Sequence, residues 1–417
     1  MRPSLAVLVF CAAASAIFAD EPPSWSEFDV SSANGQWVAQ VRRSPRGGGA
    51  PAANAWDDDW TLRVYREKDG KPDGEVSWTA PFRHSGYSGG LLSGNGAHFV
   101  TVSDWFHLHG APVTIDSARG PVAHTPHGVD FGVPAAKLKP TASHWLWLGE
   151  ARPQFDDDWQ TLKVTTIEDT KRWVDLDSGR LCGHASGPLR GSLRVDRRVA
   201  ALGERVQFSF GLLNISGKEA VTWHAGVWAN HRVFLVDEND KESPLTAFGK
   251  TARNCFGPDR DKNVKWKVPP GSWDDQIKEE SLDRHFVVDR PGRYTLKVMY
   301  EDVSNGAAVK LVSIPVEIVF FKDSLPSPAE IGDRITDCVA KDHRAGLEPL
   351  VEGGKIADED WEALKKSEAM NSYRFLAEGH FAPKENAVDL GGDAHQMSVK
   401  CAKAEGGWRI AKIERSR

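Results

Sequence analysis

Hydrophobic and polar residues alternate along several segments in the middle of the chain. These segments are Val206–Leu212, Val264–Val268, Leu296–Tyr300 and Val312–Phe320. Alternate side chains of a strand point to opposite faces of its sheet, so one face of each segment is expected to lie in a core. Turn sequences separate the segments. The pattern predicts that residues 186–322 form a two-sheet β-sandwich.

The pattern changes near the C-terminus, after a short linker expected at 323–327. Ser327-Pro328-Ala329-Glu330 is a capping box with proline at the first helical position, which predicts that a helix begins there. A second helix is predicted over Asp358–Met370 from its single apolar face. Strand-like runs follow at Tyr373–Phe381, Met397–Cys401 and Trp408–Ile410. Helices that precede an antiparallel sheet predict a small α+β domain at 328–417.

The N-terminal region, 20–185, is rich in tryptophan. It holds ten of the sixteen Trp residues, at positions 25, 37, 56, 60, 78, 105, 145, 147, 159 and 173. Asn34–Ala39 and Asn95–Val100 resemble the turn and strand of propeller blades, and Trp173–Arg180 resembles a closing strand. About 160 residues supply only three or four blades, at or below the lower limit for a closed ring. We therefore expect an irregular β domain built from blade-like hairpins.

Two further resemblances refine this picture of a multidomain, mainly β protein. Pro291-Gly292-Arg293-Tyr294 resembles the corner of immunoglobulin-like and fibronectin-like domains, which implies a Tyr hydroxyl bonded to upstream backbone. The order of elements over 328–414, with the ending Gly407–Ile413, resembles the nuclear transport factor two-like (ketosteroid-isomerase-like) superfamily. That resemblance implies a cone-shaped C-terminal domain.

Residues 1–19 have the features of a signal peptide. Arg2 precedes a mostly apolar run from Leu5 to Phe18, and Ala19 is followed by a charged, proline-rich segment. The run is too short for a stable membrane span, and no later segment reaches the ~20 apolar residues that a transmembrane helix needs. The mature chain is therefore expected to be exported, to the periplasm or the extracellular space, without a transmembrane segment.

Export would change both the number of cysteines in the chain and their tendency to form disulfides. Cys11 would be removed with the signal peptide, which leaves an even number of cysteines in an oxidising compartment. We expect two local disulfides, Cys182 with Cys255 and Cys338 with Cys401. Four unpaired buried thiols are the alternative.

Charge and motifs exclude several functions. The chain has 52 Lys and Arg against 58 Asp and Glu, a net charge of -6, and no dense basic block. Sequence-independent nucleic-acid binding therefore has no electrostatic basis. The chain also lacks the G-x-S-x-G elbow of hydrolases and both glycine-rich nucleotide-binding motifs. No nucleophile or nucleotide site is predicted.

Two clusters could hold a metal ion, although no cofactor is expected. Asp57, Asp58 and Asp59 could supply oxygen ligands to calcium, but alternate side chains of an extended segment diverge, so solvated turn carboxylates are favoured. His107 and His109 would share a strand face and could bind zinc together with His144. Exposed histidines without a metal are the favoured interpretation.

The strongest candidate for ligand binding is the segment with Trp56 and Trp60 flanking Asp57 and Asp59. An exposed indole face can stack on the apolar face of a sugar ring, whereas a buried Trp fills a β core. The core role is favoured for most of these Trp residues, and Trp56 and Trp60 are the least explained. Because no catalytic motif is found, we predict an exported, non-catalytic binding or scaffolding protein that recognises a glycan or a protein partner.

Two alternatives place an active site elsewhere, and the sequence leaves the oligomeric state open. One is a hydrolase or isomerase with an acid–base pair in the C-terminal cone, drawn from Asp342, His343, His380, Asp393 and His395. The other is a metal-dependent enzyme that uses the segment from His107 to His144.

Overall fold

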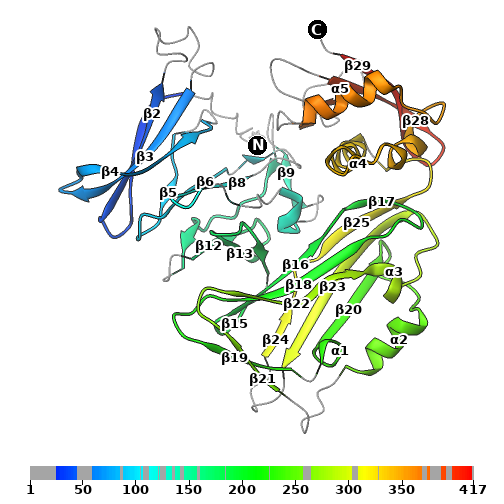
Figure 1. The fold of residues 1–417 in the computed structure, drawn as a ribbon, viewed down its shortest axis with the longest axis horizontal. Coiled ribbons are helices and arrows are strands. Elements are labelled where there is room, and N and C mark those ends of the chain that lie inside the picture. The colour runs from blue at the N-terminus through cyan, green and yellow to red at the C-terminus, as the bar shows by residue number, and fades with distance from the viewer. Residues whose placement is uncertain are drawn as a thin grey trace, which may run out of the picture.

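The chain forms a mainly β, multidomain protein with several separate sheets and few helices (Figure 1). The computed structural model describes residues 25–44, 59–84, 88–103, 105–106, 112–120, 122, 128–133, 137–140, 145–156, 160–183, 185–224, 226–256, 264–302, 309–326, 328–368, 373–375, 387–390 and 397–415. The predicted signal peptide lies outside these residues. Among the helices that the structure describes, none is both long and apolar enough to cross a membrane.

The N-terminal region contains four antiparallel sheets among its described residues. The first comprises β1 (Phe28–Ser31), β2 (Trp37–Ser44), β3 (Asp59–Lys68) and β4 (Lys71–Phe82). The second comprises β5 (Leu91–Leu92), β6 (His98–Val102) and β8 (Val113–Ser117), and the third β7 (Trp105–Phe106), β10 (Trp145–Leu146) and β9 (Lys139–Pro140). The fourth comprises β11 (Gln154–Phe155), β12 (Thr161–Thr165), β13 (Lys171–Asp175) and β14 (Leu181–Cys182), and a 3-10 helix, η3, spans Gly128–Phe131.

Period-two patterning explains how these short strands build two cores. In β3, Trp60, Leu62 and Val64 are buried while the residues between them are more exposed. They pack with Trp37 and neighbouring apolar residues of the first sheet. A second core forms around Trp147, which is fully buried against strands β12 and β13.

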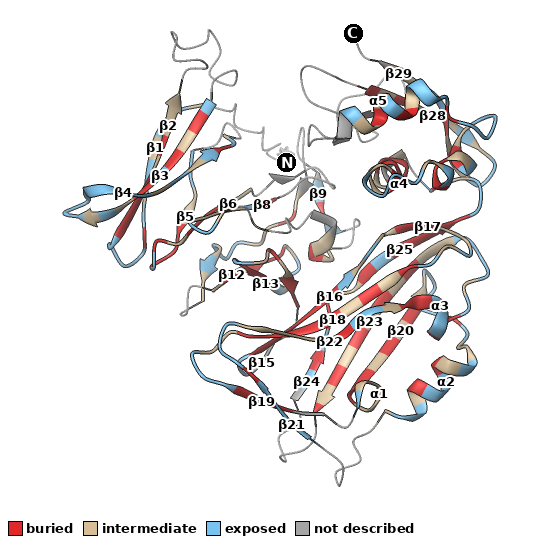
Figure 2. Ribbon diagram, in the orientation of Figure 1, coloured by how far each residue is buried: buried red, intermediate tan, exposed pale blue. Residues whose placement is uncertain are grey.

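The middle region consists of two sheets that share one core, as the alternation predicts. One sheet has the order β15 (Ala185–Ser186), β16 (Leu189–Val195), β18 (Gln207–Asn214), β22 (Trp273–Ser281). The other has the order β17 (Val199–Ala201), β25 (Val316–Phe321), β23 (Gly292–Asp302), β20 (His231–Asp237), with β24 (Val309–Val312) paired to β23. Phe208, Phe210 and Leu212 of one sheet and Leu296, Val298 and Tyr300 of the other are buried in the common core (Figure 2).

Three helices and a two-stranded ribbon accompany this pair of sheets. The helices are α1 (Val227–Asn230), α2 (Ala247–Asn254) and α3 (Leu282–His285), and a separate two-stranded ribbon joins β19 (Ala220–His224) to β21 (Val264–Val268). The predicted corner bond is present, since the Tyr294 hydroxyl donates to the Arg290 carbonyl over 3.0 Å.

The C-terminal region places two helices against a sheet. The helices are α4 (Pro328–Ala340) and α5 (Asp358–Glu368), with the 3-10 helices η6 (Arg344–Gly346) and η7 (Glu348–Leu350) between them. The sheet has the order β26 (Tyr373–Phe375), β27 (Ala387–Leu390), β28 (Met397–Ala404), β29 (Gly407–Arg415). Helix α4 begins at the proline of the predicted capping box.

The C-terminal region packs directly on the middle region. Its core contains Ile335 and Trp361 from the helices and also Val199, Val319 and Phe321 from β17 and β25. Leu325 stands in the predicted linker, yet it is fully buried and its backbone pairs with that of Trp408. These contacts make one continuous apolar cluster of residues between 199 and 410.

A buried arginine anchors the same interface. The Arg334 side chain has no exposed surface, and it donates hydrogen bonds to the carbonyls of Gly346, at 2.8 and 3.0 Å, and Val199, at 3.2 Å. It also lies 2.8 Å from Glu204 Oε2. Arg197 contacts the same carboxylate. Burial opposes ionisation of Glu204, but the bonds from Arg334 and the Ala201 amide outweigh it and lower its pKa.

The structure has Cys182, Cys255, Cys338 and Cys401 as free thiols, which corrects the prediction of two disulfides. Cys182 is buried beside Trp173 and Leu213, whereas Cys255 is exposed after α2, so this pair occupies different environments. Cys338 and Cys401 pack as small apolar side chains of the C-terminal core. Burial raises the pKa of Cys338 to about 11 and of Cys401 to about 12.

Candidate functional site

Most of the predicted site residues lie outside the described part of the chain. This holds for Trp56 and Asp57, for the histidines His107, His109 and His144, and for His380, Asp393 and His395. Within the described residues, no three His, Cys, Asp or Glu side chains gather as metal ligands would.

Trp60 belongs to a core and not to a sugar-binding surface. Its exposed fraction is 5%, and its ring lies 4.4 Å from that of His84. Strand β3 turns Trp60 inward together with Leu62, so the indole face is covered. Asp59, one position earlier, points to the exposed side. Trp60 and Asp59 therefore lie on opposite faces of β3.

Asp342 and His343 do not form an acid–base pair in the described structure. Asp342 accepts a hydrogen bond from the Trp361 indole over 3.3 Å and lies 3.5 Å from the Lys365 ammonium. The His343 backbone amide closes the end of α4 by donating to Cys338. Asp342 thus links α4 to α5.

The β19–β21 ribbon carries the most exposed tryptophan that the structure describes. Trp266 is 50% exposed and Val264 is 62% exposed. Across the ribbon, Thr222 pairs with Trp266 and His224 with Val264. The sequence pattern predicted that Val264, Trp266 and Val268 all face a core, but only Val268 is buried (Figure 2).

One face of the ribbon packs on the sandwich. Ala220 and Val268, which pair with each other, both belong to the core of the middle region. The buried Asn214 amide donates to the carbonyls of Val268 and Lys218, each over 2.8 Å. Trp266 lies opposite Thr222, which is fully buried, so the half-exposed indole belongs to this same face.

Lysines alternate with the apolar residues of β21 and therefore point to its other face. Lys265 and Lys267 are both exposed, and the Lys267 ammonium lies 2.8 Å from Glu219. Val221, opposite Lys267, is 44% exposed. The ribbon therefore presents an exposed aromatic side chain on one face and cationic and aliphatic side chains on the other.

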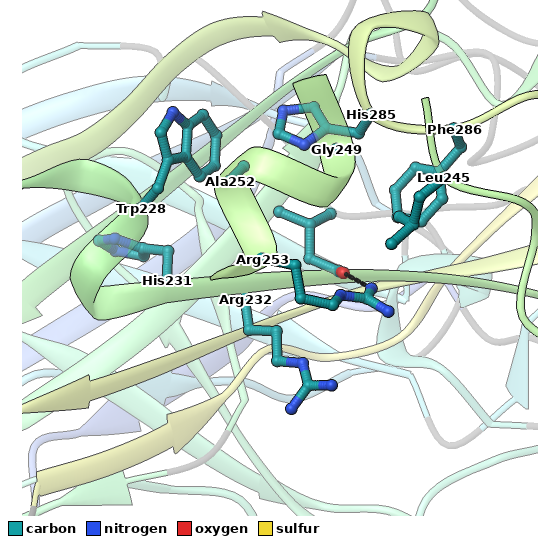
Figure 3. A pocket seen from close by; sticks show the side chains of 10 residues that line it. Trp228, His231, Arg232, Leu245, Gly249, Ala252, Arg253, His285 and Phe286 are labelled. Carbon is teal, nitrogen blue, oxygen red and sulfur yellow. Dashed lines mark hydrogen bonds between the residues drawn. The ribbon is translucent and has the colours of Figure 1, made fainter. Parts of the chain in front are cut away.

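A shallow pocket lies between α2 and β20 (Figure 3). Its empty volume is about 240 Å³ when the open solvent at its entrance is included. It is lined by Trp228, His231, Arg232, Val233, Leu245, Gly249, Ala252, Arg253, His285 and Phe286. Thr246 caps α2 by accepting from the Gly249 amide over 3.0 Å. A Cβ at position 249 would lie 2.1 Å from the His285 carbonyl, so glycine allows α2 to approach α3 closely.

His285 forms one wall of the pocket as a buried neutral ring. Its side chain is 3% exposed and contacts the rings of Trp228, at 4.7 Å, and Phe248, at 5.0 Å. Burial, and then the positive charges of Arg284 and Arg253, lower the pKa of His285 to about 4. Its Nε2 lies 3.5 Å from Glu280 Oε1 but makes no hydrogen bond with the described residues.

The arginines of the pocket differ in their partners. Arg253 binds Glu242 at 2.7 Å and donates to the Val233 carbonyl over 2.9 Å (Figure 3). Arg232 lies over the Phe234 ring at 5.0 Å, and its buried Nε has no hydrogen-bond partner among the described residues.

No family model matches this chain, and no curated protein matches it in sequence. Its function therefore has to be inferred from its own residues and their geometry.

Little in the sequence indicated either the exposed Trp266 or the pocket. Trp266 appeared as one more apolar position of a strand, although the flanking lysines could have indicated an exposed one. The pocket unites residues from 228 to 286 on separate elements, and no motif connects them.

Proposed function

We propose that this protein is an exported, non-catalytic binding protein and that the β19–β21 ribbon contacts its ligand, an acidic glycan. The half-exposed Trp266 of this ribbon carries the proposal. An indole presents a large flat apolar face with a polar edge, which suits the apolar face of a pyranose ring. Lys265 and Lys267 point to the other face of β21, and their long side chains would meet the carboxylates of an acidic glycan that passes around the open edge of the strand.

The same lysines favour a glycan over a partner strand. Within the described structure β21 pairs only with β19, so it is an edge strand. Lysine on an edge strand opposes the addition of another strand, because its charge would have to be buried. A cationic ribbon on a chain of net charge -6 is also a local reversal of sign, which favours an anionic ligand.

The location and the finer fold are part of the proposal. The signal-peptide pattern of residues 1–19 supports export to the periplasm or the extracellular space. Two sheets around one core and the Tyr294–Arg290 bond support an immunoglobulin-like middle domain. Two helices followed by an antiparallel sheet support a cone-like C-terminal domain.

The test is binding of the full mature chain to polygalacturonate, with dextran as the neutral comparison, by calorimetry. We expect the acidic polymer to bind and Trp266→Ala to weaken it about 3- to 10-fold, since aromatic stacking contributes roughly 0.5–1.5 kcal/mol. Lys265→Glu should also weaken binding of the acidic polymer, and the difference in affinity from the parent should grow as the salt concentration is lowered. The matched control is Val76→Ala, which changes an exposed apolar residue of a different strand, β4, and should leave the affinity for the polymer unchanged.

Two results would count against the ribbon. If the acidic polymer binds and Trp266→Ala leaves the affinity unchanged, the glycan contacts another surface. If neither polymer binds but Trp266→Ala abolishes capture of a purified protein partner, the ligand is a protein.

A further inference from the structure

We propose that the fold closes the chain's one acceptor sequence for an N-linked glycan, so that a glycan on Asn214 and the folded middle region exclude each other. The acceptor sequence is Asn214-Ile215-Ser216. In an exported chain such a sequence normally indicates a surface loop. The inference concerns a covalently attached sugar and does not rest on the proposed function of the ribbon.

Asn214 is the last residue of β18, which lies between β16 and β22 in its sheet. It continues the alternation of Phe208, Phe210 and Leu212, so its side chain points into the sandwich. Asn214 has no exposed surface. A sugar attached to this side chain would have to occupy space that core residues already fill.

All polar atoms of the Asn214 side chain are engaged within the fold. Its Nδ2 donates to the carbonyls of Lys218 and Val268, each over 2.8 Å. Its Oδ1 accepts from the Ser216 amide over 3.0 Å and lies 2.8 Å from the Ser216 hydroxyl. The amide nitrogen and the hydroxyl that define the acceptor sequence therefore both serve to hold the turn after β18.

Glycosylation is chemically incompatible with these bonds. A bond forms between Nδ2 and the anomeric carbon of the sugar, the bond between that carbon and the phosphate of a lipid-linked oligosaccharide donor breaks, and Nδ2 loses one proton. The single hydrogen left on Nδ2 can bond only one of the two carbonyls, so the other loses its partner. The sugar would also displace Val268, the residue through which β21 joins the core.

The order of modification and folding decides the outcome. Transfer of the glycan needs an accessible Nδ2, which the unfolded chain offers and the folded chain does not. A chain that is modified as it enters a secretory pathway therefore cannot bury Asn214 afterwards. A chain that folds first is protected.

The experiment expresses the full chain through a eukaryotic secretory pathway and maps glycan occupancy by peptide mass, in the secreted soluble protein and in the retained aggregated protein. We expect no glycan on Asn214 in the soluble protein, because modified chains are confined to the aggregated protein. The matched control, Lys241→Thr, creates an acceptor at Asn239 in an exposed turn. The glycan on Asn239 should appear in the soluble protein.

Amide hydrogen exchange of unglycosylated protein gives a second measurement. Asn214→Asp keeps the shape of the side chain but replaces Nδ2 with an oxygen that faces two carbonyls. The amides of β19 and β21 should then exchange at least about tenfold faster. Asn239→Asp makes the same chemical change in the exposed turn and should leave their exchange unchanged.

Three results would overturn the proposal. One is soluble, cooperatively melting protein that carries a glycan on Asn214. Another is equal occupancy of Asn214 in the soluble and the aggregated protein. The third is unchanged exchange of β19 and β21 in Asn214→Asp. If that variant does not fold, the amide is essential as proposed, and occupancy in the parent remains the measurement that can refute the exclusion.

Discussion

Replacing Arg334 by methionine should weaken the attachment of the C-terminal helices to the middle sandwich. The guanidinium has no exposed surface and bonds to Glu204 and to the carbonyls of Val199 and Gly346. The variant leaves the Glu204 carboxylate, itself only 14% exposed, with Arg197 as its remaining charged partner. Removing one member of a buried ion pair typically costs about 3–5 kcal/mol, and because Arg197 still contacts Glu204 we expect a loss at the lower end of this range.

Two further variants isolate the cause. Arg284→Met removes an exposed arginine from its i,i+4 pair with Glu280, and should cost only about 0.3–0.5 kcal/mol. Combining Arg334→Met with Glu204→Gln also removes the carboxylate that has lost its contact with Arg334, so the double variant should be more stable than Arg334→Met alone.

Amide hydrogen exchange in α4 is the appropriate assay, because a chain with several cores need not unfold in one step. The pH dependence of the stability measured in this way gives a second readout. The pKa of Glu204 is lowered in the folded state, so the stabilisation it provides is present above the unfolded pKa and disappears as pH falls through the folded one. A loss below about 1 kcal/mol in Arg334→Met, or a double variant no more stable than the single one, would refute this account.

Three other changes have defined expectations. Burial raises the pKa of Asp116 to about 6, so the free energy of unfolding of the parent should increase as pH falls through 6. In urea titrations at pH 7, Asp116→Asn should be about 1–2 kcal/mol more stable than the parent, and this pH dependence should be absent from the variant. Tyr294→Phe removes the bond to the Arg290 carbonyl and should cost about 1 kcal/mol in the same assay; an unchanged midpoint would contradict it. Trp60→Ala should cost about 3–5 kcal/mol and Trp266→Ala below about 1 kcal/mol in thermal melts, and the reverse order would show that Trp60 is not a core residue.

Local patterns predicted the elements better than the sites. Alternation over Val206–Leu212 placed Phe208 and Phe210 in the core, and the capping box placed the start of α4 at Pro328. These predictions held because strand periodicity and helix capping depend on residues close in sequence. The corner bond of Tyr294 was predictable for the same reason, since its partner is four residues upstream.

Features that depend on distant residues were missed or misjudged. The alternation in Val264–Val268 is real, but burial of Trp266 requires a layer that covers it, and this side chain is half exposed although Thr222 opposite it is buried. The cysteine count gave no information on whether Cys182 and Cys255 approach each other. The pocket between α2 and β20 is lined by residues from 228 to 286 on separate elements, which only the folded chain brings together.

The shared apolar cluster of the C-terminal region has a consequence for the order of assembly. Val199, Val319 and Phe321, which complete that cluster, leave the ribosome before α4 does. The newly made helices can therefore dock on a sheet that already exists, in keeping with folding from the N-terminus during synthesis. A fragment starting at residue 328 would lack this template and would expose Ile331 and Ile335 to water, so it should aggregate when expressed alone.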